Sequence, residues 1–372
     1  MGDVDARTLG ERIREARLRA GASQDDLGRS AGLERTVINK IESGIRKVSA
    51  IELSDIASAL NVRMSSFFSD PTPALVAHRS SQGLDTADSM IDALLAKLVV
   101  DVEFVASLLP SEFEIEAPEF DSPASNQEAE HLAAQARKLM SIEADSPIHA
   151  LSDAVAQIGL FAFSQNLGVD TADAGTVKLR TGGVSLINSY MQVGRRRLAL
   201  AHELGHYLVR DEYKIDWRIN GHAVDDVEHE SKLDRFARAL LLPKSVVEQQ
   251  WMPLADKYGE LRAAIKLASN FRVDMSTLAR RLHELGIAAD EASIRACRPR
   301  RADMIELDLF VPLPELEESS VPRRFAKAVL KLVEDERISR ERALDLLQGT
   351  LAEEDLPEIR ERQPGELWKY VS

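Results

Sequence analysis

One segment of this chain has the residue types of a hydrolytic metal centre: His202, Glu203 and His206, spaced as H-E-x-x-H in an otherwise apolar run. On an α-helix, two histidines four positions apart lie on one face with their Cβ atoms about 6 Å apart, so both imidazoles can bind one metal ion. Glu203 then projects beside the metal, where its carboxylate can take a proton from metal-bound water. The alternative is a chance pentapeptide on a surface helix. The apolar flanks argue against it, because buried polar groups need partners.

A third ligand must come from elsewhere, because a catalytic zinc site has three protein ligands and keeps its fourth position for water. Downstream, a second amphipathic helix opens at Glu230 and closes on three leucines and Pro243. Rival ligands precede it: His222, Asp225, Asp226, Glu228 and His229. Such side chains in a polar loop are usually solvated, but the spacing alone leaves the choice open.

These two helices resemble the ImmA/IrrE family of metallopeptidases, whose H-E-L-G-H helix is followed by a helix of the form E-x-x-A-N-x-F-A-x-x-L-L-x-P. The matching positions of the second helix are Glu230, Phe236, Ala237, Leu240 or Leu241, and Pro243. The resemblance implies a gluzincin-like Zn²⁺ site with Glu203 as the general base. Its implied metal ligands are His202, His206 and Glu230.

The resemblance extends along the chain on both sides of this motif. This chain departs from the family pattern at two positions, with Leu233 where the family usually has Ala and Asp234 where it usually has Asn. Neither is a ligand position. Residues 184–188 alternate as a short strand, which in the family lies at the edge of the active-site cleft, where an extended substrate can pair with it. Residues 267–286 resemble a small helix-turn-helix-like element that packs against the catalytic core. The candidates for stabilising the oxyanion are Tyr190, Tyr213 and His222.

The N-terminus carries a different pattern, two short helices joined by a turn. Ser23 caps a helix whose first turn is acidic, and that helix ends at Ala31 and Gly32 before a further helix over residues 33–44. Two helices joined by a short glycine-containing turn make a helix-turn-helix, with the second helix sized for the major groove. Residues 7–70 resemble the Cro and phage-repressor (XRE-type) DNA-binding domain.

By that match, six side chains are expected to contact DNA. Arg35, Thr36 and Lys40 would face base edges from the recognition helix. Gln24, Arg46 and Lys47 would contact phosphates. For each of them, a solvated polar side chain is the alternative. For the whole domain, the alternative is a helix-turn-helix that contacts only proteins.

Charge limits how this domain can bind DNA. The chain has 47 Lys and Arg against 61 Asp and Glu, a net charge of −14. Residues 1–70 hold 11 basic and 11 acidic residues, so the rest of the chain carries the whole excess. An acidic body repels DNA, so binding must come from a local basic patch and should be modest and salt-sensitive. Formation of a homodimer would raise the affinity for DNA.

The remaining sequence predicts the organisation of the chain. Residues 90–109 have helical apolar spacing and are followed by a Pro-, Ser- and acid-rich linker from Pro110 to Gln127. We expect a helix-turn-helix domain at 7–70, the helix and linker at 71–127, the peptidase domain at 128–290 and a small module at 300–372. In that module, a strand is expected at 304–312, with helices over 323–334 and from Ser339.

The fold class expected is multidomain and mainly α with a small β-sheet: an all-α helix-turn-helix bundle plus an α+β zincin-like domain. Cys297 is the only cysteine, so the chain has no internal disulfide. Neither a signal peptide nor a run of 18 apolar residues is present, so we expect a cytoplasmic protein without membrane contact.

These patterns predict a DNA-binding transcription regulator that is also a zinc metalloendopeptidase. The family's usual targets make a transcriptional repressor in a stress, phage or mobile-element response the expected substrate. Its other expected partner is a double-stranded operator. One alternative is a non-proteolytic regulator that uses the peptidase fold for sensing or interaction. Another is the catalytic partner of a toxin–antitoxin-like pair.

Overall fold

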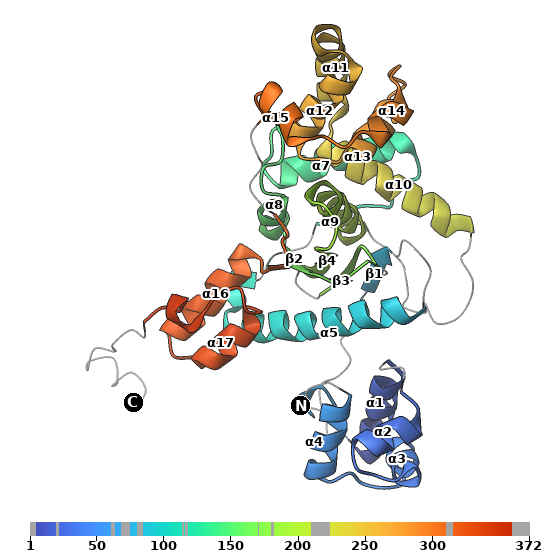
Figure 1. Cartoon of the computed structure of the whole chain (residues 1–372). Helices are drawn as coiled ribbons and strands as arrows, with labels where there is room; N and C mark the ends of the chain where they lie inside the picture. Colours follow the sequence, from blue (N-terminus) through green and yellow to red (C-terminus); the bar gives the residue numbers. More distant parts are fainter. Residues whose placement is uncertain are drawn as a thin grey trace. The chain divides into compact units, whose positions relative to one another are not determined.

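The computed structural model describes residues 5–19, 22–60, 64–67, 75–79, 85–113, 115, 118–169, 171–179, 182–209, 224–309 and 315–358. The chain divides into two compact units (Figure 1). The first unit comprises Met1–Pro73 and Leu84–Ala93, and the second comprises Ala74–Gly83 and Leu94–Ser372.

The first unit is a small helical bundle. Its elements are α1 (Ala6–Arg19), α2 (Gln24–Ser30), α3 (Arg35–Glu42), α4 (Ala50–Ala59) and the 3-10 turn η1 (Met64–Phe67). Capping boxes start two of these helices, with Ser23 and Asp26 at α2 and Ser49 and Glu52 at α4. Their apolar faces form one core: Ile13, Leu27, Ile38, Ile41, Leu53, Ile56 and Phe67.

Two glycines allow this bundle to close. A Cβ at Gly10 would lie 2.2 Å from the backbone oxygen of Ile41, so only glycine lets α1 and α3 approach this closely. Gly32 has a φ of 67° in the turn between α2 and α3, where an L side chain would be strained. The predicted helix-turn-helix bundle is therefore present, with the recognition helix at α3.

The second unit is built around a mixed sheet of five strands in the order β1-β3-β4-β2-β5. The strands are β1 (Leu75–Arg79), β2 (Leu160–Gln165), β3 (Ala174–Lys178), β4 (Gly183–Asn188) and β5 (Ser319–Ser320). β2 and β4 run parallel, while β3 pairs antiparallel with β4 on one side and with β1 on the other. The strand predicted at 184–188 is β4, which lies in the centre of the sheet between β3 and β2. The prediction that this strand forms an edge of the sheet is therefore wrong.

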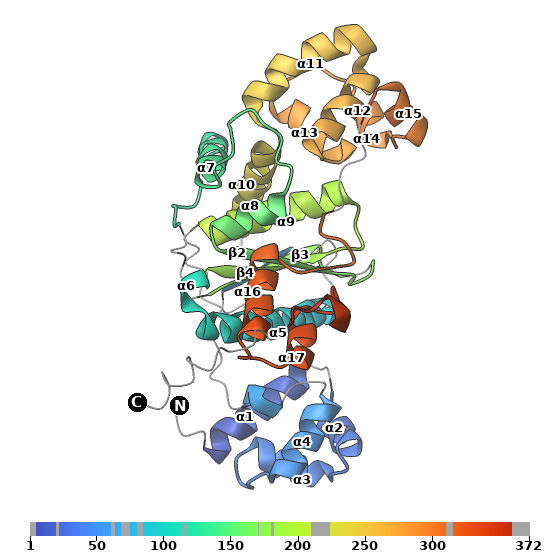
Figure 2. The ribbon, with the colours of Figure 1, turned by 90° about the vertical axis from the view of Figure 1, so that its left-hand side faces the viewer.

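Helices cover both faces of the sheet (Figures 1 and 2). On one face lie α8 (Leu151–Gln157) and α9 (Val193–Leu208). On the other lie α16 (Arg323–Glu334) and the part of α5 (Asp85–Leu108) that belongs to this unit, from Leu94 onward. Both faces of β4 are therefore covered, and all six of its residues are buried. Sequences of such doubly covered strands are apolar rather than alternating.

A further group of helices lies beyond α9, on the side away from the sheet (Figure 1). Its members are α7 (Asn126–Leu139), α10 (Val224–Leu241), α11 (Lys244–Tyr258), α12 (Glu260–Phe271), α13 (Met275–Glu284), α14 (Glu291–Ala296) and α15 (Arg301–Glu306). The buried side chains of α7 to α14 share one hydrophobic core with α9. The helix-turn-helix-like element predicted at 267–286 corresponds to α12 and α13 and packs on this core, as expected.

The segment interpreted as a linker belongs to the second unit. Pro110–Phe113 form the short helix α6, and the buried Phe113 ring lies 5.2 Å from that of Phe161 on β2. Further along, the N–H of Phe120 donates to the backbone oxygen of Leu208 at 2.8 Å. The linker interpretation of 110–127 does not match these contacts, because apolar residues within the acidic segment attach it to the sheet and to α9.

The C-terminal residues are also part of this unit. Phe325 of α16 packs 5.4 Å from Phe163 of β2, and β5 pairs antiparallel with the end of β2. Glu315 forms a buried ion pair with Arg197 of α9. α17 (Arg340–Leu346) follows α16, and η2 is Glu353–Asp355. A separate module at 300–372 is therefore not seen among the described residues.

Most of the elements predicted from the sequence are found. The helix over 323–334 is α16, the helix starting at Ser339 is α17, and the amphipathic helix at 90–109 is part of α5. The strand expected at 304–312 is wrong, because its first residues belong to α15 and residues 310–314 lie outside the described ranges. The overall class, mainly helical with a small sheet, is confirmed. In the described part of the chain, no helix has the length and apolar character needed to cross a bilayer.

Candidate functional site

The two histidines lie on the buried face of α9. His202 is 1% and His206 7% exposed, and their Nε2 atoms are 3.1 Å apart. The glycine between them allows α10 to approach: a Cβ at Gly205 would lie 3.0 Å from a ring carbon of Phe236 and 3.2 Å from Leu233. This close packing of α9 against α10 places side chains of α10 opposite the two imidazole rings.

α10 brings Glu230 to both histidines. Its Oε2 lies 3.1 Å from Nε2 of His202, and its Oε1 lies 3.4 Å from Nε2 of His206. Burial alone would raise the pKa of Glu230, but the contacts with His202 and His206 outweigh it and hold the pKa well below its usual range. The Glu230 side chain is 47% exposed, so the cluster opens to solvent on this side.

Among the described residues, His202, His206 and Glu230 are the one group of three His, Cys, Asp or Glu residues whose ligand atoms could hold a metal ion. The residues that the sequence predicted as ligands are thus brought together. The rival His229 lies outside this group: its Nδ1 is 2.8 Å from the Ser122 hydroxyl, and its ring is 6.0 Å from that of His206.

Of the remaining rivals, Glu228 is the one whose side chain the structure describes, and it is not part of this group. Glu228 is exposed on α10. The side chains of Asp225 and Asp226 lie outside the described part, as do residues His222 and Tyr213. Tyr190, the remaining oxyanion candidate, is 56% exposed.

Glu203 is fully buried on α9, beside the histidines. In the described part of the chain, neither of its carboxylate oxygens has a hydrogen-bond partner of normal geometry. Burial raises the pKa of Glu203, and the nearby His206, His202 and the hydroxyl of Thr176 offset only part of this rise. A buried carboxylate without such a partner is costly in an apolar interior, so Glu203 in this position lowers the stability of the fold.

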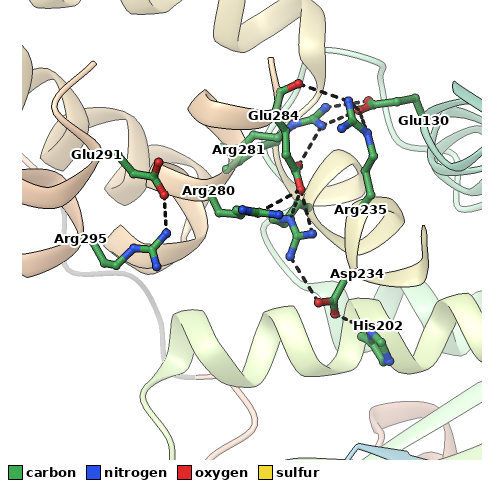
Figure 3. Close-up of polar contacts among 11 residues, drawn as sticks. Glu130, His202, Asp234, Arg235, Arg280, Arg281, Glu284, Glu291 and Arg295 are labelled. Atoms are coloured by element: carbon green, nitrogen blue, oxygen red, sulfur yellow. Dashed lines mark hydrogen bonds and ion pairs between the residues drawn. The ribbon is translucent and has the colours of Figure 1, made fainter. Parts of the chain in front are cut away.

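A contact that sequence reasoning missed lies behind His202. Oδ1 of Asp234 is 3.0 Å from Nδ1 of His202, on the ring atom that does not face Glu230 (Figure 3). Arg238 lies 3.6 Å from Asp234, and Glu284 of α13 pairs with Arg238 at 2.8 Å. The available signal was spacing: Asp234 follows Glu230 by four positions and so shares its helix face.

The proposed DNA-contacting residues divide into two groups. Four are exposed: Arg35, Thr36 and Lys40 on α3, and Lys47 after it. The other two are engaged within the domain. The Gln24 amide donates to Glu42 at 2.8 Å, and Arg46 pairs with Glu52 at 2.8 Å. Exposure therefore favours the first four as DNA contacts.

Comparisons with known proteins agree with both units. Residues 13–67 match the helix-turn-helix family model, and residues 144–283 match the model described as the IrrE N-terminal-like domain, an M78 peptidase family. The match to the peptidase model covers α9 and α10, so it includes all three candidate ligands.

Individual relatives are also similar over part of the chain. An uncharacterized HTH-type transcriptional regulator of Sinorhizobium medicae is 37% identical over 93 residues, which are 25% of this chain and 61% of that protein. The chain thus spans about three fifths of that relative's length. An uncharacterized transcriptional regulator in the ATPase CF(0) region of Rhodospirillum rubrum is 38% identical over 77 residues, 19% of this chain and 71% of that protein.

Among solved structures, the restriction-modification controller protein C.AhdI from Aeromonas hydrophila is 33% identical. It matches 18% of this chain and 100% of its own, with a TM-score of 0.17. The sequence matches to the family models and relatives support DNA binding by the first unit and a metallopeptidase family for the second. The chain therefore belongs to the XRE-type helix-turn-helix transcriptional regulators and carries, after that domain, an ImmA/IrrE peptidase domain.

Proposed function

We propose that this chain is a DNA-binding zinc metalloendopeptidase whose substrate is a transcriptional repressor. The observation that carries this proposal is the triangle of His202, His206 and Glu230 with the buried carboxylate of Glu203 beside it. The family match supports a metallopeptidase, and the complete ligand set supports an active one.

The donor set fits zinc. Two imidazoles and one carboxylate are a common set of three protein ligands at catalytic zinc, with bonds of about 2.0–2.1 Å. In a tetrahedral site, such bonds place neighbouring donor atoms about 3.3 Å apart. The three donor pairs are 3.1, 3.1 and 3.4 Å apart, so little rearrangement is needed to hold the ion.

The chain's own residues then supply proton transfer and orientation. A bound Zn²⁺ would polarise the scissile carbonyl and acidify water at the open position. Glu203 takes the proton from the attacking water and delivers it to the leaving amine. Asp234 faces Nδ1 of His202 and so favours the tautomer whose Nε2 lone pair points toward the metal.

The first unit brings this activity to DNA. Arg35, Thr36 and Lys40 lie exposed on the recognition helix, where they would read base edges, while Lys47 would contact phosphate. A homodimer on a two-fold operator would double these contacts. Binding near a promoter would raise the local concentration of the peptidase around a repressor.

The test is metal analysis of the purified protein together with cleavage of candidate repressors. The expected metal content is about one Zn²⁺ per chain, as the three-ligand rule implies. His206→Ala should lose the metal, while Glu203→Gln should keep the metal and lose cleavage. Equal cleavage by the wild type and Glu203→Gln would overturn the proposal.

Two further outcomes are informative. A wild type that is zinc-loaded but cleaves no candidate favours the non-proteolytic regulator, in which the peptidase fold serves for sensing. If Glu230→Ala keeps full metal content and activity, the third ligand is wrong, and His229 becomes the next position to test.

A further inference from the structure

β1 is the edge strand of the sheet next to β3, and it contacts α9, the helix that carries His202 and His206 (Figure 1). It pairs antiparallel with β3 over five residues, from Leu75 opposite Lys178 to Arg79 opposite Ala174. In sequence, β1 lies between two segments of the first unit, Met1–Pro73 and Leu84–Ala93. The outer edge of β3 is thus paired with five residues of the chain itself.

β3 packs against α9, the helix that carries Glu203, and the hydroxyl of Thr176 at the middle of β3 lies near the Glu203 carboxylate. The residue of β1 that pairs with Thr176 is Ala77, and β1 also contacts α9. The midpoint of β1 is therefore level with the general base.

An extended peptide could use the same edge. A free strand edge offers alternating N–H and C=O groups, and peptides bind such edges by adding a strand. With β4 in the centre of the sheet, β3 is the strand near Glu203 that could offer an edge, and β1 occupies it. A substrate can pair with β3 only after β1 has left.

We propose that β1 is a built-in occupant of the substrate-binding edge and that it competes with the peptide substrate for β3. This inference rests on the proposed peptidase function and adds its regulation. Compared with the six-residue parallel pairing of β2 and β4 at the centre of the sheet, β1 has five residues and one paired side. Outer elements of this kind open locally at a lower free energy than the core does.

The test weakens or strengthens β1 in the full-length, zinc-loaded protein. Ala77→Pro removes the N–H of the central residue and disfavours the strand. Ala77→Val is the matched control, because a β-branched residue favours the strand. Three quantities are measured: hydrogen exchange of the amides of residues 174–178, binding of a labelled synthetic peptide of residues 74–83, and cleavage of a susceptible repressor.

The expected results run in opposite directions. Ala77→Pro should speed amide exchange in β3, bind the synthetic peptide and cleave several-fold faster than the wild type at equal zinc content. Ala77→Val should bind no peptide and cleave more slowly. Unchanged protection of β3 in Ala77→Pro, with no peptide binding, overturns the inference.

The outcomes separate this inference from the proposed function. If Ala77→Pro binds the peptide but no variant cleaves any repressor, the peptidase proposal fails and the occupancy of β3 stands. If the wild type and Ala77→Pro cleave at the same rate, the peptidase proposal stands and the competition is refuted.

A second variant covers the case in which the proline prevents folding. Leu75→Cys with Lys178→Cys, in a Cys297→Ser background, places two thiols at paired positions of β1 and β3. The oxidised protein should neither bind the peptide nor cleave, and reduction of the same sample should restore both. Equal peptide binding and cleavage before and after reduction contradict the inference.

Discussion

Asp234 of α10 faces His202 of α9, with Oδ1 of the carboxylate 3.0 Å from Nδ1 of the ring. Carboxylates in this position fix the orientation of metal-binding histidines, and their loss typically costs 10–100-fold in metal affinity. Asp234→Ala should therefore weaken zinc binding by about that factor, measured by competition with a chromophoric chelator. Asp234→Asn keeps an oxygen acceptor and should lose much less. Wild-type affinity in Asp234→Ala would show that the contact does not position the ring.

Gly205 sets the distance between α9 and α10, the two helices that carry the candidate ligands. Gly205→Ala should destabilise the fold by about 1–3 kcal/mol, as overpacking does, because its Cβ would lie 3.0 Å from Phe236 and 3.2 Å from Leu233. The displaced α10 should also weaken zinc binding. Adding Leu233→Ala makes room on one side and should recover part of both losses, measured by urea unfolding and zinc titration. Unaltered zinc affinity in Gly205→Ala would mean that helix spacing does not place Glu230.

The exposed and the engaged basic residues of the first unit should behave differently toward DNA. Arg35→Ala should relax sequence preference and cost about 1–3 kcal/mol in specific binding. Lys47→Ala should weaken all sequences alike and reduce the salt slope by about 1. Arg46→Ala should mainly lower folding stability, because Arg46 pairs with Glu52. Footprinting over a salt series measures these effects, and a footprint that survives deletion of residues 1–70 refutes the assignment.

Glu130 should make stability depend on pH. It lies between Arg281 at 2.6 Å and Arg235 at 3.0 Å (Figure 3). Burial would raise the pKa of Glu130, but the two arginines outweigh it and lower the pKa from its ordinary 4.5. The stabilisation is therefore present above pH 4.5 and lost as the pH falls through the folded-state pKa.

The matching variant is Glu130→Gln. At pH 7 it should lower the free energy of unfolding by about 3 kcal/mol, because it leaves the fully buried Arg281 without its main partner. Urea unfolding of both proteins at decreasing pH should show the difference shrinking below the ordinary glutamate pKa. A difference that stays constant with pH would assign the effect to packing alone.

The sequence was sufficient where the signal was local or fixed by spacing. His202 and His206 share a helix face through their separation alone, and the helix over 323–334 has uninterrupted amphipathic spacing. The region from 304 alternates apolar and polar residues, which favours a strand. Yet α15 forms there, and the backbone N–H of Arg300 donates to Asp303 at the helix start. Alternation over so few residues is a weak signal against a helix start.

Non-local contacts could not be predicted in the same way. A strand pattern at 184–188 indicates a strand but not its neighbours, so the central place of β4 could not be read from the sequence. The segment from Pro110 has a linker's composition, and its attachment to the fold depends on non-local contacts such as those of Phe113 with Phe161 and of Phe120 with Leu208. In the sequence, Asp234 was only a departure from the family pattern. Its contact with His202 could not be predicted, because that contact depends on how α9 and α10 pack.

The buried pair of Arg197 and Glu315 has a consequence for exchanging parts of this chain with those of other family members. Arg197 lies on α9 five residues before His202, and Glu315 also accepts from the backbone of Ser152 at 2.9 Å. A chimera joined near residue 300 would leave the guanidinium buried without its carboxylate, at a cost typical of a broken buried pair. Recombination between homologues should therefore preserve both positions together, and viable junctions should fall before Ser152 or after Glu315 rather than between them.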